Sequence, residues 1–143
     1  MSVLIRDTGF TAEDWPHGFT PSRREITGEN GAGLDLPGDI DPADLVESLH
    51  GLGMIRIAFA SFADGRGFTL ARQLRLMGYK GRLRASGPLL ADQYTMARRC
   101  GFDEVEISTD HAKRQPEPSW LFRADWRIND YQAQMRGEGI ASA

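Results

Sequence analysis

The residues of this chain best suited to chemistry are Gly65, Arg66 and Gly67, which stand between a predicted strand and a predicted helix. Glycines let a backbone come close to a ligand, and the first turn of a helix offers N–H groups with partial positive charge. An arginine adds a planar fork of donors that matches sulfate, phosphate or carboxylate. The pattern therefore predicts an anion-binding turn that begins at Asp64. The alternative is a tight turn in which Asp64 and Arg66 pair with their neighbours.

Arg84 and Asp92 complete this candidate site. Arg82 and Arg84 lie two apart, so they share one face of a predicted strand. Arg84 is nearer the carboxyl end of that strand, where open α/β sheets bind ligands. Asp92 falls in the first turns of a predicted helix, where it stabilises the positive helix end or orients Arg84. We expect Arg84 to meet Arg66 if their strands are neighbours. The alternative is a salt bridge from Arg84 to Asp64 or Asp92.

Other kinds of site have weaker support from the residues. A dinucleotide fingerprint requires Gly or Ala where this chain has Leu70, and an acid that is missing near Ser86. Cys100 is the single cysteine, so disulfide exchange and an iron–sulfur cluster within one chain are excluded, and we expect a buried structural thiol. The three histidines match no metal-binding or triad spacing, so no metal site is predicted. The residues point to no particular cofactor.

The composition is that of one globular domain. The chain has 143 residues, of which 41% are hydrophobic and 26% are charged. No apolar run approaches the length that spans a membrane, and residues 1–6 lack the pattern of a secretory signal. Together with the single cysteine, these features predict a cytoplasmic protein.

Charge is distributed unevenly along the chain, although the net charge is only −3. Residues 25–50 hold seven acids and no Lys or Arg, whereas residues 65–100 hold eight Lys or Arg and one acid. A basic region of this kind binds an anion or an oppositely charged surface. The alternative is that these charges lie on solvated faces.

Strands and helices alternate through the middle of the chain, which predicts a single α/β domain with a small, mostly parallel sheet. The predicted parallel strands are Ile55–Ala60, Arg82–Ala85 and Glu104–Ile107. The predicted helices run from Asp41 to Gly51, Thr69 to Met77 and Pro88 to Gly101. We expect four or five strands in consecutive βαβ units, as an open sheet or a half-barrel. Residues 1–33 are expected to form an irregular arm, residues 34–108 the βαβ core and residues 109–143 a tail.

The tail is rich in aromatic residues, namely Trp120, Phe122, Trp126 and Tyr131. Aromatic side chains anchor many interfaces, so the tail is a candidate partner-binding surface. Packing across its own domain, or within a homodimer, is the alternative.

Several short motifs follow one another in residues 62–103. They are Phe-x-Asp-Gly-Arg-Gly-aromatic at 62–68, Ala-Arg-x-Leu-Arg at 71–75, Gly-Tyr-x-Gly-x-Leu-Arg-Ala at 78–85, Asp-Gln at 92–93 and Arg-Cys-Gly-Phe-Asp at 99–103. In this order they resemble the DUF934 family, small bacterial proteins described as oxidoreductases of sulfite reduction because of their association with sulfite reductase. The resemblance implies an accessory of assimilatory sulfite reduction that contacts the sulfite reductase haemoprotein or its electron source.

Two hypotheses of function remain open. In the first, the chain is a non-catalytic accessory that binds a sulfite reductase component through its basic face or aromatic tail. In the second, it is a small enzyme or sensor that binds a sulfur oxyanion or a phosphate-bearing cofactor at Asp64, Gly65, Arg66, Gly67, Arg84 and Asp92. We expect neither nucleic acid nor a membrane among its partners.

Overall fold

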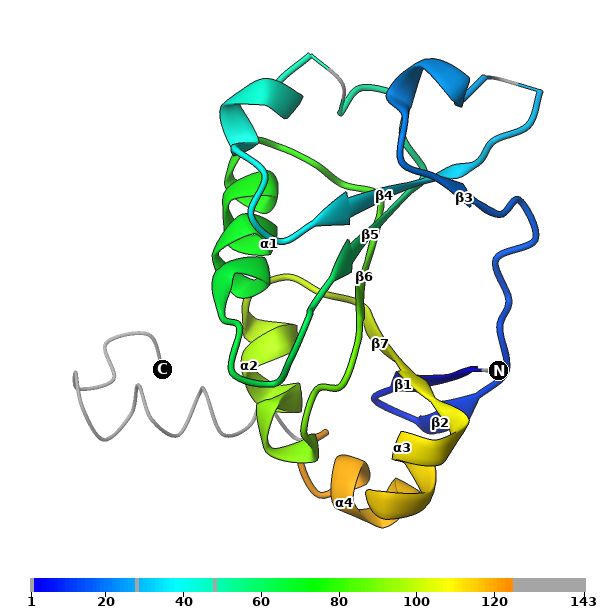
Figure 1. The fold of residues 1–143 in the computed structure, drawn as a ribbon, viewed down its shortest axis with the longest axis vertical. Helices are drawn as coiled ribbons and strands as arrows, with labels where there is room; N and C mark the ends of the chain where they lie inside the picture. The colour runs from blue at the N-terminus through cyan, green and yellow to red at the C-terminus, as the bar shows by residue number, and fades with distance from the viewer. Residues whose placement is uncertain (1, 28, 48, 125–143) are drawn as a thin grey trace, which may run out of the picture.

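A seven-stranded sheet organises the part of the chain that the computed structural model describes, namely residues 2–27, 29–47 and 49–124. The strands follow the order β2-β1-β7-β6-β5-β4-β3 across the sheet (Figure 1). They are β1 (Ser2–Arg6), β2 (Gly9–Thr11), β3 (Phe19–Thr20), β4 (Gly33–Pro37), β5 (Met54–Ala58), β6 (Arg82–Ser86) and β7 (Glu104–Ser108). Strands β3 to β7 are parallel, and β1 is antiparallel to both β7 and β2.

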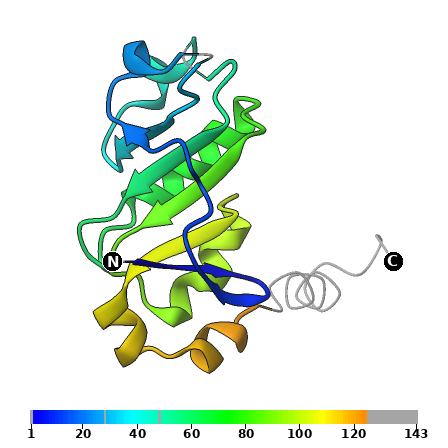
Figure 2. The same ribbon diagram turned by 90° about the vertical axis from the view of Figure 1, so that its right-hand side faces the viewer.

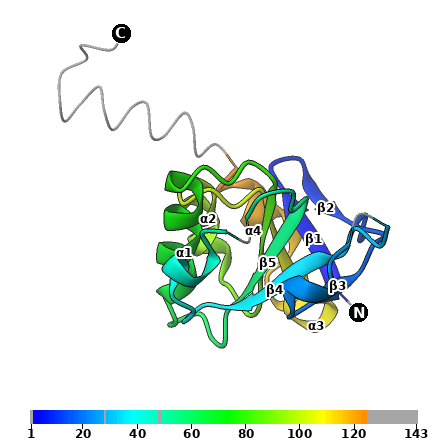
Figure 3. The ribbon, with the colours of Figure 1, turned by 90° about the horizontal axis from the view of Figure 1, so that it is seen from above.

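Helices cover one face of this sheet. The two nearest the middle strands are α1 (Arg66–Leu76) and α2 (Tyr94–Arg99), which lie on the same side (Figures 1 and 3). Two further short helices, α3 (Thr109–Arg114) and α4 (Glu117–Leu121), follow β7. The chain between β2 and β3 crosses the face of the sheet opposite α1 and α2 (Figure 2).

The core forms because successive strand residues point to opposite faces. Ile55, Ile57, Leu83 and Val105 are all fully buried and belong to the same apolar cluster as residues of α1 and α2. The helices supply Leu70, Ala71, Leu74, Tyr94 and Ala97 to this cluster. The intervening residues of the same strands are largely charged, so only the helix-covered face is apolar.

The predicted parallel neighbours β5, β6 and β7 are confirmed, and the described residues form a single α/β-like domain. The prediction of four or five strands was wrong, because the sheet has seven. Residues 1–33, expected to be irregular, contribute β1, β2 and β3. These strands pair with segments that are distant in the sequence. In addition, β2 and β3 are too short to show an alternation of apolar and polar residues.

Two helix predictions also need correction. Asp41 does cap a helix, since its side chain accepts from the backbone N–H of Ala43 at 2.9 Å, but a 3₁₀ helix, η2 (Pro42–Leu45), replaces the predicted longer one. The predicted helix from Pro88 to Gly101 is shorter, a 3₁₀ helix η3 (Ala91–Gln93) followed by α2. The region after residue 108, expected to be a tail, holds α3 and α4. Trp120 of α4 is buried against Tyr94, with ring centroids 6.2 Å apart, so this residue of the aromatic tail packs on its own domain. Trp126 and Tyr131 lie outside the described residues.

The two glycines beside Arg66 have different roles. A Cβ atom at Gly67 would lie 2.5 Å from the ring of Phe59, which is itself buried in the core. At Gly65 such an atom would meet nothing within 4 Å. Gly67 is therefore required by close packing of α1 against the sheet.

These environments predict that two alanine variants will differ in how much stability they lose. Gly67→Ala is expected to lower the free energy of unfolding by about 1–3 kcal/mol, because the ring of Phe59 has no room to move. Gly65→Ala should change it by less than about 1 kcal/mol. Urea denaturation of both variants measures the difference, and equal losses would contradict the packing role of Gly67.

Candidate functional site

The structure does not bring all the predicted site residues together. Arg66 begins α1 and its side chain is 63% exposed, whereas the side chain of Arg84 is fully buried in the sheet face that the helices leave open. The two arginines share no bonding partner among the described residues. Arg84 and Arg66 thus belong to two separate environments.

The turn at Asp64 is closed by a local ion pair. Arg66 donates from Nε to Asp64 Oδ1 at 3.0 Å and from Nη2 to Oδ2 at 3.2 Å, and its backbone N–H donates to Oδ1 as well. These bonds lower the pKa of Asp64. Asp39 lies 3.8 Å from the same guanidinium. The pairing of Asp64 with Arg66, one of the two alternatives expected from the sequence, is therefore present.

Asp92 lies with Gly65 along a groove between α1 and α2, which has a volume of about 820 Å³. Its carboxylate pairs with Arg123 at 2.7 Å, so its charge is balanced locally. The sides of the groove combine apolar and basic residues. They include Phe68, Arg72 and Leu76 from α1, and Thr95, Met96 and Arg99 from α2. We call this surface the helix groove.

Cys100 also lines the helix groove and is half-buried. Burial raises the pKa of its thiol, and the nearby charge of Arg72 opposes this effect without cancelling it. The thiol is therefore less acidic than an ordinary cysteine, as expected for a structural residue.

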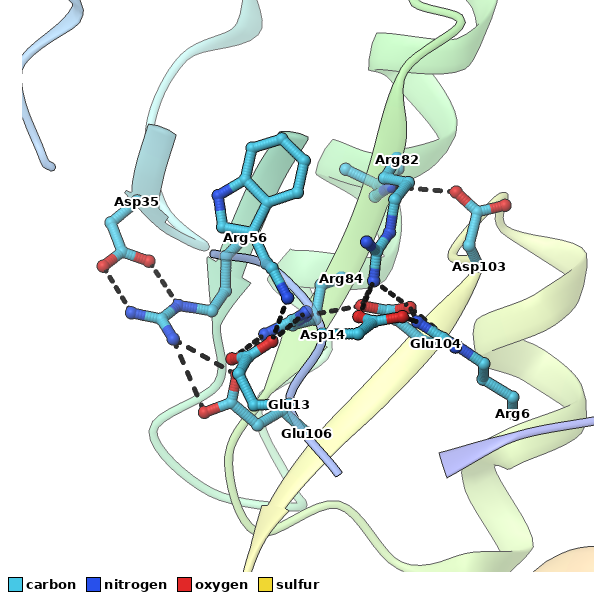
Figure 4. Close-up of polar contacts among 12 residues, drawn as sticks. Arg6, Glu13, Asp14, Asp35, Arg56, Arg82, Arg84, Asp103, Glu104 and Glu106 are labelled. Carbon is cyan, nitrogen blue, oxygen red and sulfur yellow. Dashed lines mark hydrogen bonds and ion pairs between the residues drawn. The ribbon is translucent and has the colours of Figure 1, made fainter. Parts of the chain in front are cut away.

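The opposite face of the sheet carries a row of paired charges (Figure 4). Strand register places Asp35 beside Arg56, Arg56 beside Arg84, and Arg84 beside Glu104. Arg56 donates to Asp35 at 2.6 and 2.7 Å, and Arg84 donates to Glu104 at 2.6 Å and to Glu106 at 2.9 Å. We call this set, with Arg6 and Arg82, the charge row.

A segment of irregular chain crosses the charge row between β2 and β3 (Figures 2 and 4). We call this segment, residues 12–18, the strap. Its Glu13 accepts two bonds from Arg84, at 2.7 and 2.8 Å. Asp14 accepts from Arg6 at 2.6 Å and from Arg82 at 2.9 Å. The strap is thus attached to the sheet by two neighbouring carboxylates.

Aromatic rings accompany these ion pairs. The ring of Trp15 lies 5.7 Å from the guanidinium of Arg82. Phe19 begins β3, and its ring lies 3.7 Å from the guanidinium of Arg56 and 5.4 Å from the guanidinium of Arg84. Contacts of this kind attract a cation to the face of a ring.

Electrostatics favours the ionised forms of Arg84 and of Asp14 in the strap. Burial alone would lower the pKa of Arg84, but the hydrogen bonds that it donates to Glu13, Glu104 and Glu106, together with the charge of Glu104, outweigh burial, and the pKa is raised. The hydrogen bond from Arg6, helped by Arg82 and opposed by burial, lowers the pKa of Asp14 to about 2.

Sequence reasoning missed the acidic members of the charge row. It placed Arg82 and Arg84 on one face of a strand, but assigned Arg84 to Asp64 or Asp92 as alternative partners. The available signal was the alternation of Glu104 and Glu106 with apolar neighbours in β7, which matches that of the arginines in β6.

A second cavity adjoins the charge row where β6 and β7 end. It has a volume of about 520 Å³ and shares Glu106 with the row. Its other polar lining residues include Ser86, Ser108, His111 and Arg114. We call it the edge pocket, and its position at the carboxyl ends of parallel strands is where α/β sheets commonly bind ligands.

The geometry defines a small α/β protein with a groove on its helical face and a charge row on the other. A family model described as "Bacterial protein of unknown function (DUF934)" matches residues 33–139, so the chain belongs to the DUF934 family. No curated protein and no solved structure matches the chain. Among the described residues, no helix has the length and apolar character needed to cross a membrane.

Replacing Arg84 should damage the fold far more than replacing Arg66. Arg84→Ala leaves buried Glu104 without its closest partner, and we expect the free energy of unfolding to fall by about 3–5 kcal/mol. Arg66→Ala removes only a solvent-screened, exposed ion pair, so its effect on the free energy of unfolding should be small. Urea denaturation followed by circular dichroism compares the two, and similar losses would show that the charge row contributes little.

The attachment of the strap should weaken in acid. The pKa of Asp14 is about 2 in the folded protein against an ordinary value of 3.8. A lowered pKa contributes stability that is fully present above the ordinary value and is lost as the pH falls through the folded value. The difference in free energy of unfolding between the wild type and Asp14→Asn should therefore shrink from about pH 5 to about pH 2.

Urea denaturation at several pH values measures that difference. Asp44→Asn, which removes an exposed carboxylate outside the charge row, is the control. A difference for Asp14→Asn that does not change with pH would contradict the assignment.

Proposed function

We propose that this protein is a non-catalytic accessory of assimilatory sulfite reduction that binds the sulfite reductase haemoprotein or its electron source. The helix groove is the proposed binding surface, and the observation that carries the proposal is its combination of exposed apolar and basic side chains. Leu76 is 79% exposed and Met96 is 53% exposed, although both are large apolar residues. Such residues are exposed together on functional surfaces more often than elsewhere.

The chemistry of the groove indicates the kind of partner segment that would fit. Arg72 and Arg99 flank the apolar residues, and the nearby acid Asp92 is already paired with Arg123. Apolar anchors with arginines beside them are typical of protein interfaces. We infer that the groove binds a segment with an apolar side chain and neighbouring acids. The cytoplasmic location expected from the sequence is part of this proposal.

The alternative function, a small enzyme or sensor for a sulfur oxyanion or a phosphate-bearing cofactor, would use the turn at Asp64–Gly67. The observation in its favour is that Arg66 is largely exposed and that the space beside Gly65 is open. Against it, Arg66 already pairs with Asp64, and Arg84 lies in the charge row.

Groove variants test the proposed function in co-purification and affinity measurements with the haemoprotein. The double variant Leu76→Ser, Met96→Ser should weaken binding roughly tenfold or more, as expected for two interface anchors. Arg72→Glu should reduce the binding affinity more at low salt than at high salt. The reason is that salt screens the repulsion between the new glutamate and an acidic partner segment. Val46→Ser is the matched control, since Val46 is 60% exposed and does not line the groove.

Two outcomes would overturn the proposal. One is failure of the wild type to bind the haemoprotein or its electron source at any salt concentration. The other is turnover of sulfite by the purified chain alone, which would favour the alternative. An equal loss of binding in Val46→Ser would exclude the helix groove as the binding surface.

A further inference from the structure

The arginines beneath the strap are arranged as a receptor for an anion. We propose that Arg6, Arg82 and Arg84 form a binding site for a small dianionic oxyanion, and that Glu13 and Asp14 of the strap occupy this site as internal ligands. The site is separate from the helix groove and lies on the opposite face of the sheet (Figures 2 and 4).

The strap carboxylates make the contacts that an external oxyanion would make. Glu13 is held by two parallel bonds from Arg84, at 2.7 and 2.8 Å. The two oxygens of Asp14 are each bonded to a different arginine, with Arg6 at 2.6 Å and Arg82 at 2.9 Å. Paired donors of this geometry bind sulfate and phosphate oxygens as well as carboxylates.

The balance of charge favours exchange of the strap for another anion. Without the strap, the four arginines of the charge row, Arg6, Arg56, Arg82 and Arg84, face three sheet carboxylates, Asp35, Glu104 and Glu106. The net charge of this face is therefore positive without the strap. It becomes negative when the carboxylates of Glu13 and Asp14 are added. A dianion that replaced both carboxylates would restore the same total charge.

Besides these two carboxylates, the strap has other contacts with the sheet: the carbonyl of Gly18 accepts a bond from the N–H of Gly33 at 2.8 Å, and the ring of Trp15 lies 5.7 Å from the guanidinium of Arg82. Six of its seven residues are exposed, the exception being the half-buried Trp15. The side chains of Glu13 and Asp14 are 40% and 45% exposed, even though the arginine that Glu13 binds is fully buried. Detachment of the strap would leave the buried Arg84 with two carboxylates, Glu104 and Glu106, and the loss of its third partner, Glu13, is the main electrostatic cost. An incoming anion removes that cost.

The edge pocket provides room beside the site. It opens where β6 and β7 end and shares Glu106, which accepts a bond from Arg84 at 2.9 Å. Its Arg114 and the hydroxyl groups of Ser86 and Ser108 are donors close to the site. With a volume of about 520 Å³, the pocket is larger than a sulfate ion.

The first experiment removes the internal ligands and measures anion binding by calorimetry. Glu13→Gln, Asp14→Asn should bind sulfate or malonate roughly tenfold more tightly than the wild type, because the internal competitors are lost. The two probes distinguish a tetrahedral oxyanion from a dicarboxylate. Asp44→Asn, Glu47→Gln removes two exposed carboxylates elsewhere and is the control for net charge. Adding Arg82→Ala to the first variant should abolish the gain.

A second experiment uses the unmodified protein, so that the proposal does not depend on the variants folding. Hydrogen exchange of the amides in residues 12–18 should become faster in sulfate than in sodium chloride of equal ionic strength. The proposal is overturned if exchange is the same in both salts. It is also overturned if the folded double variant binds neither probe more tightly than the wild type and the control.

Discussion

The buried guanidinium of Arg84 imposes the strongest constraint on this structure. A charge without access to water requires partners with the opposite charge, and three carboxylates supply them. Glu104 and Glu106 come from the neighbouring strand β7, whereas Glu13 lies 71 residues away in the chain. These ion pairs join β6 to β7 and attach the N-terminal region across the sheet. The strap and the strands β6 and β7 therefore meet at one ionic centre.

The two faces of the sheet are held by different forces. On the helical face, apolar residues such as Ile57 and Leu83 are buried against α1 and α2, and this burial has little directional preference. On the other face, each charged side chain must meet its partner at hydrogen-bonding distance, which makes the arrangement specific. The alternation of side chains along β5, β6 and β7 allows the same strands to serve both faces.

This separation also divides the possible functions. The helix groove lies over the apolar core and presents Leu76 and Met96 beside basic residues, as a protein-binding surface would. The charge row and the edge pocket lie on the other side, where arginines and hydroxyl groups suit a small anion. The arginines of β5 and β6 fall within residues 33–139, which the family model matches, whereas Glu13 and Asp14 precede that region. The charge row thus joins residues from inside and outside the matched region.

The sequence by itself determined the parallel order of β5, β6 and β7, the existence of α1, which begins at Arg66 and not at the predicted Thr69, and the shared face of Arg82 and Arg84. These features depend on local periodicity and on residues that begin or end helices, and both are visible within a few positions of the chain. Family membership was also recognisable, because the motifs of residues 62–103 occur in a fixed order. The cap at Asp41 was correctly identified for the same local reason.

Only the tertiary structure decided which charges meet. Whether Arg84 pairs with Asp92, Asp64 or Glu104 depends on strand register and on the path of the strap, and neither leaves a local pattern. The same holds for β1, β2 and β3, whose pairing depends on partners distant in sequence. Gly67 illustrates the difference most clearly: its spacing suggested room for a ligand, whereas the fold places the ring of Phe59 there. Local sequence restricts the backbone, but contacts between distant segments determine what occupies the space around it.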